Sequence, residues 1–147
     1  MKGVLLHGGS GTRLRPLTHT GPKQLIPVAG KPISQYCLEE MRDAGIRDVA
    51  LILGPVWPEK VREYYGDGRE LGMHLSYIEQ GEPKGIAQAV GLAKDFVGQD
   101  AFVVYLGDAL YGGSRDPELF APHEPRVCLH AESLALTHPA DGRPLVL

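Results

Sequence analysis

A glycine-rich segment with cationic neighbours is the part of the sequence whose residue types point most directly to chemistry. Residues 7–18 read HGGSGTRLRPLT and follow an apolar run. Glycines expose backbone N–H groups without a Cβ in the way, and N–H groups that point into one concavity bind anions. Arg13 and Arg15 add planar charged groups that suit phosphate. The segment therefore predicts a loop that holds a polyphosphate.

A lysine follows this loop in the stretch GPKQLIP. Lys23 lies between Pro22 and Pro27, and the two prolines hold the segment extended and reduce its conformational entropy. A stiffened lysine close to a phosphate loop is typical of a positioned charge. An ordinary solvated lysine is the alternative interpretation.

The spacing within the loop excludes two familiar phosphate-binding motifs. A Walker A loop requires Gly-Lys-Ser/Thr, which does not follow at the right distance. The dinucleotide fingerprint requires a final glycine, and Leu14 occupies that position. The loop alone also leaves open a plain tight turn without a ligand.

Alternating strands and helices must position the loop at residues 8–23. The expected strands cover residues 2–7, 48–53, 74–79 and 101–106, and the expected helices cover residues 32–44, 59–65 and 86–96. Strands that are apolar nearly throughout are typical of a mostly parallel sheet with helices on both faces. Ligands of such sheets bind beyond the carboxyl ends of the strands, where this chain has the glycine loop, EQGEP and GDA. Further on, RVCLHA and PLVL are candidates for short strands.

Composition narrows the class of protein. The chain has 147 residues and a net charge of −3, which fits one domain and argues against a general nucleic-acid or anionic-membrane binder. No stretch approaches the ~18 apolar residues of a membrane span, and the start MKGVLLHGG has too short an apolar run for a signal peptide. Cys37 and Cys128 are interpreted as reduced thiols of a cytoplasmic protein, without a disulfide framework or metal-ligand spacing.

Two longer stretches resemble a known family. GGSGTRLRPLT with PKQLIPV resembles the signature of the sugar-1-phosphate nucleotidylyltransferases, and YIEQGEPKGIAQAV followed by VVYLGD is similar to their glucose-1-phosphate thymidylyltransferase branch. The resemblance implies a Rossmann-like three-layer α/β/α fold with a mostly parallel, mixed central sheet. It also implies transfer of a nucleotide from dTTP to glucose 1-phosphate, with release of pyrophosphate and with Mg²⁺ as cofactor.

The resemblance implies roles for individual residues. Arg13 would contact the β- and γ-phosphates, Lys23 the α-phosphate region, and Asp108 the metal and the nucleotide. Gln80 and Gly85 would recognise the base, because a side-chain amide matches the O4/N3–H edge of thymine or uracil. Gln24 is a weaker candidate for the same pocket. The remaining nucleotide contacts would come from Gly8, Gly9, Ser10, Gly11 and Thr12.

The chain also departs from the family pattern. His7 stands where the family has alanine, so its ring would either crowd the ribose or base or turn aside; Ala109 replaces asparagine after the metal aspartate, and Lys84 replaces an apolar residue. The resemblance covers residues 1–113, interpreted as the nucleotide-binding part of the domain, and leaves 114–147 as an atypical C-terminal segment. Family members are much longer, so a truncated, shifted or rebuilt C-terminus is expected. The resemblance implies that the missing part would supply a second lysine, for the sugar phosphate, and a second carboxylate for the metal.

Several functional hypotheses therefore remain open at this stage. The first is an enzyme of the thymidylyltransferase type, and a relative that uses UTP is a variant of it. The second is a nucleotide-binding module without turnover, and the third is a structural remnant without a ligand. Because family members commonly form tetramers, a homo-oligomer is a further expectation.

Overall fold

The computed structural model describes the backbone of residues 1–107, 135–137 and 144–146, and the side chains of residues 1–12 and 14–107. The strands are β1 (Lys2–His7), β2 (Pro27–Val28), β3 (Lys31–Pro32), β4 (Asp48–Leu53), β5 (His74–Glu79), β6 (Phe102–Leu106), β7 (Ala135–Thr137) and β8 (Pro144–Val146). The helices are α1 (Ile33–Asp43), α2 (Pro58–Tyr65), α3 (Ile86–Gly91) and α4 (Lys94–Val97), with short 3₁₀ turns η1 (Thr12–Leu14), η2 (Lys23–Leu25) and η3 (Arg69–Leu71). Among the described residues, no helix has the length and apolar character needed to cross a bilayer.

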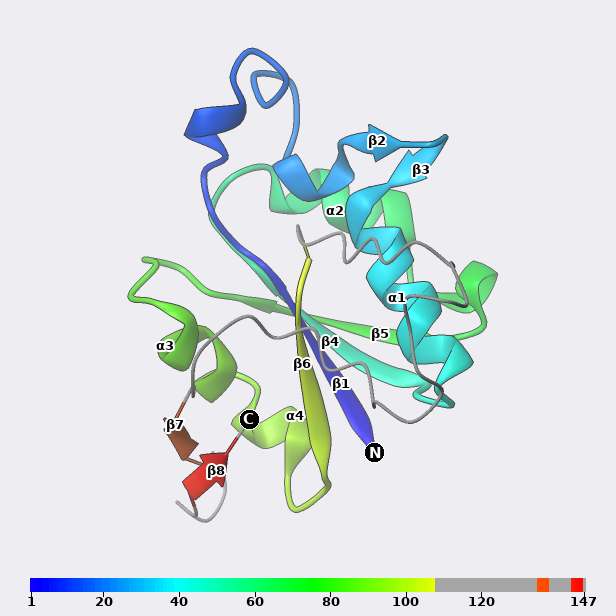
Figure 1. Cartoon of the computed structure of the whole chain (residues 1–147), viewed down its shortest axis with the longest axis vertical. Coiled ribbons are helices and arrows are strands. Elements are labelled where there is room, and N and C mark those ends of the chain that lie inside the picture. Colours follow the sequence, from blue (N-terminus) through cyan, green and yellow to red (C-terminus); the bar gives the residue numbers. More distant parts are fainter. Residues whose placement is uncertain (108–134, 138–143, 147) are drawn as a thin grey trace, which may run out of the picture.

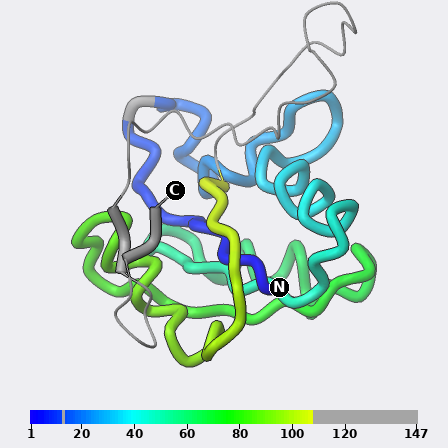
Figure 2. The backbone as a smooth tube through the Cα atoms, turned by 60° about the horizontal axis from the view of Figure 1, so that its bottom comes forward, coloured from blue at the N-terminus to red at the C-terminus, as the bar shows by residue number. Residues whose placement is uncertain are grey.

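A four-stranded sheet in the order β5-β4-β1-β6 forms the centre of the molecule (Figure 1). All three strand pairings are parallel, and the first strand of the chain occupies an interior position. Figure 2 shows β6 running beside β1 through the middle of the molecule. The expected α/β fold with a mostly parallel sheet is therefore confirmed.

Helices cover both faces of this sheet because successive strand residues point to opposite sides. Leu5 and Leu51 face α1 and α2, where they belong to a buried cluster with Leu38, Met41 and Val61. The alternate strand residues pack in a second cluster against α3 and α4: Val4, Leu6, Ile52, Ala89, Val90, Ala93 and Val97. The sheet is the middle layer of a three-layer arrangement (Figure 1).

The expected strands and two of the expected helices are confirmed to within two residues at each end. The helix expected over residues 86–96 is wrong in one respect, because the chain forms two short helices, α3 and α4, with a turn between them. Gly91 weakens the helix interior at that point. The turn also lets Ala93 and Val97 both reach the buried cluster beneath the sheet.

A two-stranded hairpin, β2–β3, was not expected from the sequence. Pro27 pairs with Pro32 and Val28 with Lys31 in antiparallel register. The turn between them uses positive φ at Ala29 and Gly30. Prolines and a central alanine hide the usual hairpin signal, since central residues of such turns are normally Asn, Asp or Gly. The other small sheet pairs β7 with β8, which matches the expected strand at PLVL, whereas RVCLHA lies outside the described residues.

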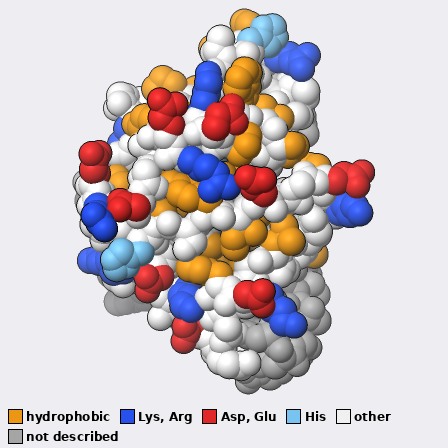
Figure 3. Space-filling model, turned by 180° about the vertical axis from the view of Figure 1, so that it is seen from behind, with side chains coloured by type: hydrophobic (Ala, Val, Ile, Leu, Met, Phe, Trp, Pro, Cys, Tyr) orange, Lys and Arg blue, Asp and Glu red, His pale blue; other side chains and the backbone are white. Residues whose placement is uncertain are grey.

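Charged side chains of both signs are mixed on the face of the molecule that Figure 3 shows. In the face shown in Figure 3, acidic and basic side chains alternate, with apolar side chains between them. This distribution agrees with the small net charge of −3. An anion site on this protein therefore has to be built locally.

Candidate functional site

The carboxyl ends of the four central strands are aligned, so the residues that follow them are brought side by side. His7 is in register with Leu53, Leu53 with Glu79, and Leu6 with Leu106. The first residues beyond the strands are Gly8, Gly54, Gln80 and Gly107. Their amides continue the ladder: Gln80 N donates to Leu53 O (2.8 Å) and Gly107 N to Leu6 O (2.9 Å). We call this row of four residues the carboxyl edge.

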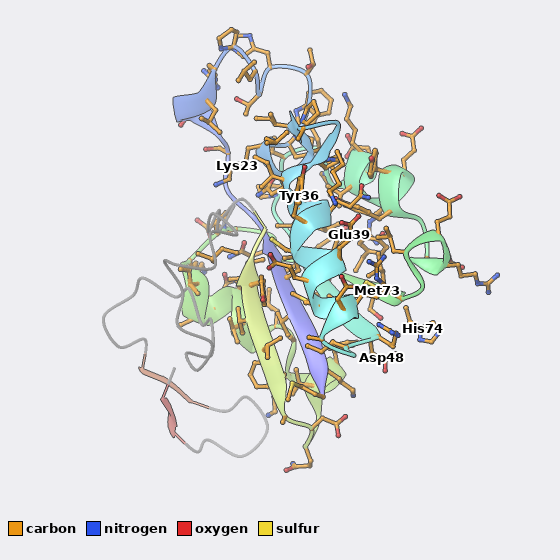
Figure 4. All side chains as sticks on the ribbon, turned by 45° about the vertical axis from the view of Figure 1, so that its right-hand side comes forward. Lys23, Tyr36, Glu39, Asp48, Met73 and His74 are labelled. Atoms are coloured by element: carbon orange, nitrogen blue, oxygen red, sulfur yellow. The ribbon has the colours of Figure 1, made fainter. Side chains whose placement is uncertain are left out.

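The glycine loop rises from the carboxyl edge, and Lys23 lies against it. Gly9 has φ of 95° and Gly11 has φ of 62°, which only glycine adopts without strain. A Cβ on Gly9 would lie 3.3 Å from Lys23 Nζ and 3.2 Å from Lys23 Cε. Figure 4 shows Lys23 at this end of the sheet, far from Asp48 and His74 at the opposite end. The structure thus places Lys23 directly beside the predicted phosphate loop.

Two further contacts hold the outer part of the loop. Thr18 is buried, and its Oγ1 donates to Gly11 O (2.8 Å), so the loop closes on itself after η1. A Cβ on Gly11 would lie 2.8 Å from Thr18 Cγ2, which leaves no room for a larger residue. Lys60 of α2 donates to Thr20 O. Ser10 and Thr12 remain exposed at the surface of the loop.

Gly54 is a positioning residue that the sequence reasoning missed. It is buried, and a Cβ on it would lie 3.1 Å from Gly8 Cα and 3.4 Å from Gly9 N. The end of β4 therefore passes the start of the glycine loop at backbone-to-backbone distance. A glycine that directly follows an apolar strand, as in LILGP, was the available signal.

A buried polar group beneath the loop, which we call the support cluster, consists of His7, Gln24, Ser34 and Tyr65. Gln24 is fully buried, and its Nε2 donates to Gly8 O at 2.5 Å. Ser34 Oγ donates to Gln24 O (3.0 Å) and shares a hydrogen bond of 2.7 Å with Tyr65 Oη. Because the single Ser34 proton is used on Gln24 O, Tyr65 is the donor in the second bond. The cluster fixes the first peptide of the loop from below.

This position of Gln24 bears on its predicted role at the base. Its amide nitrogen is committed to the carbonyl of Gly8, and its backbone carbonyl accepts from Ser34. The side chain is closed off from solvent. Gln24 supports the loop in this structure, its Oε1 has no hydrogen-bond partner among the described residues, and its contact with the base stays a prediction.

His7 turns aside from the loop into the support cluster. Its ring is 4% exposed and packs edge-on against Tyr65, with ring centroids 6.4 Å apart. Neither ring nitrogen has a hydrogen-bond partner among the described residues. Burial, assisted by the nearby charge of Lys23, lowers the pKa of His7 from 6.5 to about 3, so the ring is neutral at physiological pH. Of the two alternatives for His7, the structure supports the ring that turns aside.

The other side of the loop carries a second polar group, which we call the amide cluster: Gln80, Lys84 and Gln88. Gln80 Nε2 donates to Gln88 Oε1 (2.8 Å), and the backbone N of Lys84 donates to the same oxygen (3.2 Å). Gln80 Oε1 lies on the side of Gly8, 2.9 Å from where a Cβ on Gly8 would be. Gly85 follows with φ of 103° and open space around its Cα. The structure therefore brings Gln80 close to the glycine loop and places Gly85 five residues further, at the start of α3.

Two predicted site groups lie outside the described part of the chain: the side chain of Arg13 and the whole of Asp108. Gly107, which precedes Asp108, is at the carboxyl edge, where a Cβ would lie 3.0 Å from Leu6 O. Within residues 1–107, 135–137 and 144–146, no group of three His, Cys, Asp or Glu side chains could hold a metal ion. Cys37 is buried, and its thiol donates to Leu106 O (3.8 Å), whereas Cys128 lies outside the described residues.

Comparison with known proteins agrees with this geometry. Residues 2–126 match the family model described as nucleotidyl transferase. The chain is 56% identical over 108 residues to the low-salt glycan biosynthesis nucleotidyltransferase Agl11 of Haloferax volcanii, and 46% identical over 141 residues to a glucose-1-phosphate thymidylyltransferase of Streptomyces antibioticus. These alignments cover 74% and 96% of this chain, but only 30% and 39% of the two relatives.

A solved structure of similar fold also comes from a glucose-1-phosphate thymidylyltransferase. A putative glucose-1-phosphate thymidylyltransferase from Bacillus anthracis superposes with a TM-score of 0.73 at 38% identity, covering 81% of this chain and 48% of that one. Because the family model spans most of the chain, the protein belongs to the nucleotidyl transferase family. The model's match extends past residue 113, while the proposed division of the chain at that residue remains a prediction.

Proposed function

We propose that this chain forms the nucleotide-binding part of a glucose-1-phosphate thymidylyltransferase, which transfers a nucleotide from dTTP to glucose 1-phosphate and releases pyrophosphate. The observation that carries the proposal is the position of Lys23. Its ammonium lies against Gly9, in a loop that has positive φ at Gly9 and Gly11 and that rises from the carboxyl edge. Membership of the family supports the reaction class.

The chemistry asks the protein for positive charge rather than for a catalytic base. The attacking phosphate monoester has a second pKa of about 6, so it is mostly dianionic at neutral pH. The obstacle is the repulsion between two polyanions, followed by the charge that develops on the departing pyrophosphate. Lys23 and Arg13 would neutralise both charges, with loop amides as further donors. His7 is buried, neutral and beneath the loop, so it takes no part in proton transfer.

Asp108 is the residue that we propose to hold Mg²⁺. A carboxylate offers the oxygen ligands that this ion prefers, and Asp108 follows Gly107 of the carboxyl edge in sequence. Bound there, the ion would neutralise phosphate charge. The described residues provide no competing cluster of acidic ligands.

Calorimetry with dTTP in the presence of Mg²⁺ tests the binding part of the proposal. The wild-type chain is expected to bind dTTP, and Lys23→Ala to weaken binding by about tenfold to a hundredfold, as for a lost hydrogen bond to a charged group. Lys94→Ala, which changes an exposed lysine of α4, is the matched control and should bind like the wild type. Absence of binding by the wild type would overturn the proposal, and equal affinity for GTP would overturn its preference for a pyrimidine.

Release of pyrophosphate from dTTP and glucose 1-phosphate tests the catalytic part. Turnover that falls about 10²- to 10³-fold in Lys23→Ala would assign the activity to this site. Binding of dTTP without turnover would identify a nucleotide-binding module instead. The same assay with UTP shows whether the enzyme separates thymine from uracil, which present the same edge to Gln80.

A further inference from the structure

Gln88 forms hydrogen bonds with both the side-chain amide and the backbone carbonyl of Gln80. Gln80 Nε2 donates to Gln88 Oε1 at 2.8 Å, and the backbone carbonyl of Gln80 accepts from Gln88 Nε2 at 3.4 Å. Gln80 is buried, and Gln88 is half-buried on the first turns of α3. The segment between them, residues 81–85, is exposed throughout. Gln88 therefore ties the end of β5 to the start of α3 across an exposed connection.

The direction of these hydrogen bonds fixes which atom of the Gln80 amide points where. The oxygen and nitrogen of an amide are close in size, so a free glutamine can present either a donor or an acceptor. Gln88 Oε1 can only accept, which requires Gln80 Nε2 to face it. Gln80 Oε1 is then left on the side of Gly8 and the glycine loop.

A backbone donor excludes the flipped orientation of the Gln88 amide. Gln88 Oε1 also accepts from the backbone N of Lys84 at 3.2 Å. A flip of the Gln88 amide would place its NH₂ group against that N–H and against the NH₂ of Gln80, leaving donors face to face. The peptide of Lys84, which cannot reverse its polarity, thus sets the orientation of Gln88, and Gln88 sets that of Gln80.

From this relay we infer that Gln88 is a positioning residue that selects the base: it holds Gln80 Oε1 as an acceptor on the side of the glycine loop, so the site takes pyrimidine bases that carry a hydrogen on N3. The inference rests on the proposed function, in which Gln80 contacts a pyrimidine base. Thymine and uracil carry a hydrogen on N3, whereas the N3 of cytosine is an acceptor. The relay therefore separates dTTP from dCTP by the polarity of N3, although cytosine also carries an amino group in place of O4 and lacks the 5-methyl group of thymine.

Two substitutions separate the orienting role from a structural one. Gln88→Glu keeps an acceptor for both Gln80 Nε2 and Lys84 N, and Gln88→Met keeps the length of the side chain without an acceptor of comparable strength. Gln99→Met, on an exposed glutamine, is the matched control. Affinities of the full chain for dTTP and dCTP are measured by calorimetry, and folding is checked by urea denaturation.

The wild type, Gln88→Glu and Gln99→Met are expected to prefer dTTP, with similar ratios of the two dissociation constants. Gln88→Met is expected to lower the ratio of the dCTP dissociation constant to the dTTP dissociation constant by about tenfold or more. In this variant the Gln80 amide can turn and donate to cytosine N3. An unchanged ratio in folded Gln88→Met protein would overturn the inference while leaving the proposed function intact. Gln88→Ala, which favours the helix, repeats the test if the methionine variant does not fold. A wild type that binds neither nucleotide would overturn the proposed function itself, and this inference with it.

Discussion

The two sides of the glycine loop differ in what they offer to solvent. On the α1–α2 side, the support cluster is buried and bonded to the first peptide of the loop. On the α3 side, the amide cluster is preceded by exposed Glu79, and the segment 81–85 within it is exposed along its whole length. The loop is thus anchored from one side and left accessible from the other. Substitutions on the first side should act mainly on folding, and those on the second mainly on recognition.

The largest effect is expected at the anchor itself. Gln24→Ala should lower the free energy of unfolding by about 3 kcal/mol, because it removes buried volume and leaves the carbonyl of Gly8 without its donor. Urea denaturation measures this loss. Gln24→Leu, which restores the volume but not the donor, should lose less. A Gln24→Ala protein as stable as the wild type would show that the support cluster does not anchor the loop.

A pH-dependent loss of stability is expected from His7. Burial lowers the pKa of the folded state to about 3, so the unfolded chain binds a proton more readily below pH 6.5. Stability is therefore complete above pH 6.5 and falls as the pH drops from 6.5 toward 3. The loss between pH 7 and pH 5 should be about 2 kcal/mol.

Urea titrations at the two pH values measure this effect. His7→Leu should remove most of the difference between pH 7 and pH 5, whereas His19→Leu, on an exposed histidine, should preserve it. The same pH dependence in wild type and His7→Leu would contradict the buried, neutral ring.

A smaller effect is expected where the two backbones meet. Gly54→Ala would place a Cβ 3.1 Å from Gly8 Cα, so the two segments must separate by a few tenths of an ångström, at a cost of about 1 kcal/mol. Affinity for dTTP should also fall, because the loop shifts with Gly8. Gly91→Ala, in open space on α3, is the control and should stabilise the protein slightly. Unchanged stability and affinity in Gly54→Ala would show that the loop position is not set by β4.

The smallest effect is expected at an exposed ion pair next to Gln80, which joins β5 to α2. Glu79 pairs with Arg62 at 2.9 Å; the Glu79 side chain is largely exposed and that of Arg62 is partly exposed. Glu79→Gln should therefore change the free energy of unfolding by less than about 0.5 kcal/mol. A thermal melt beside the wild type checks this, and a loss comparable to that of Gln24→Ala would show that exposure does not limit the effect of a substitution next to the site.

Much of this arrangement could be predicted from the sequence, because buried strands require apolar residues and tight loops require glycines. Apolar runs located the central strands, and glycines with a flanking lysine located the loop. Lys23 was expected beside the loop and lies against Gly9. These features depend on local residue types and on the rule that parallel strands end at a common edge.

The contacts between segments could not be predicted in the same way. The bond from Gln24 to Gly8 and the pair of Ser34 with Tyr65 join residues that are distant in the chain, and no local pattern encodes them. The helix pattern does not distinguish Gln88 from an ordinary helical residue, because it does not encode the two hydrogen bonds that Gln88 Oε1 accepts. His7 showed the limit most clearly, since the direction of its ring depends on the alternation of β1 and on the space beside Tyr65.

The central position of β1 has a consequence for synthesis. Lys2 pairs with Phe102, so β1 must wait for a partner that is synthesised one hundred residues later. Until then, one flank of β1 carries unpaired amides and carbonyls, and contacts this distant in the chain form slowly. As the ribosome delivers the chain, the glycine loop emerges early, but the carboxyl edge beside it is complete only after β6 and Gly107 have emerged.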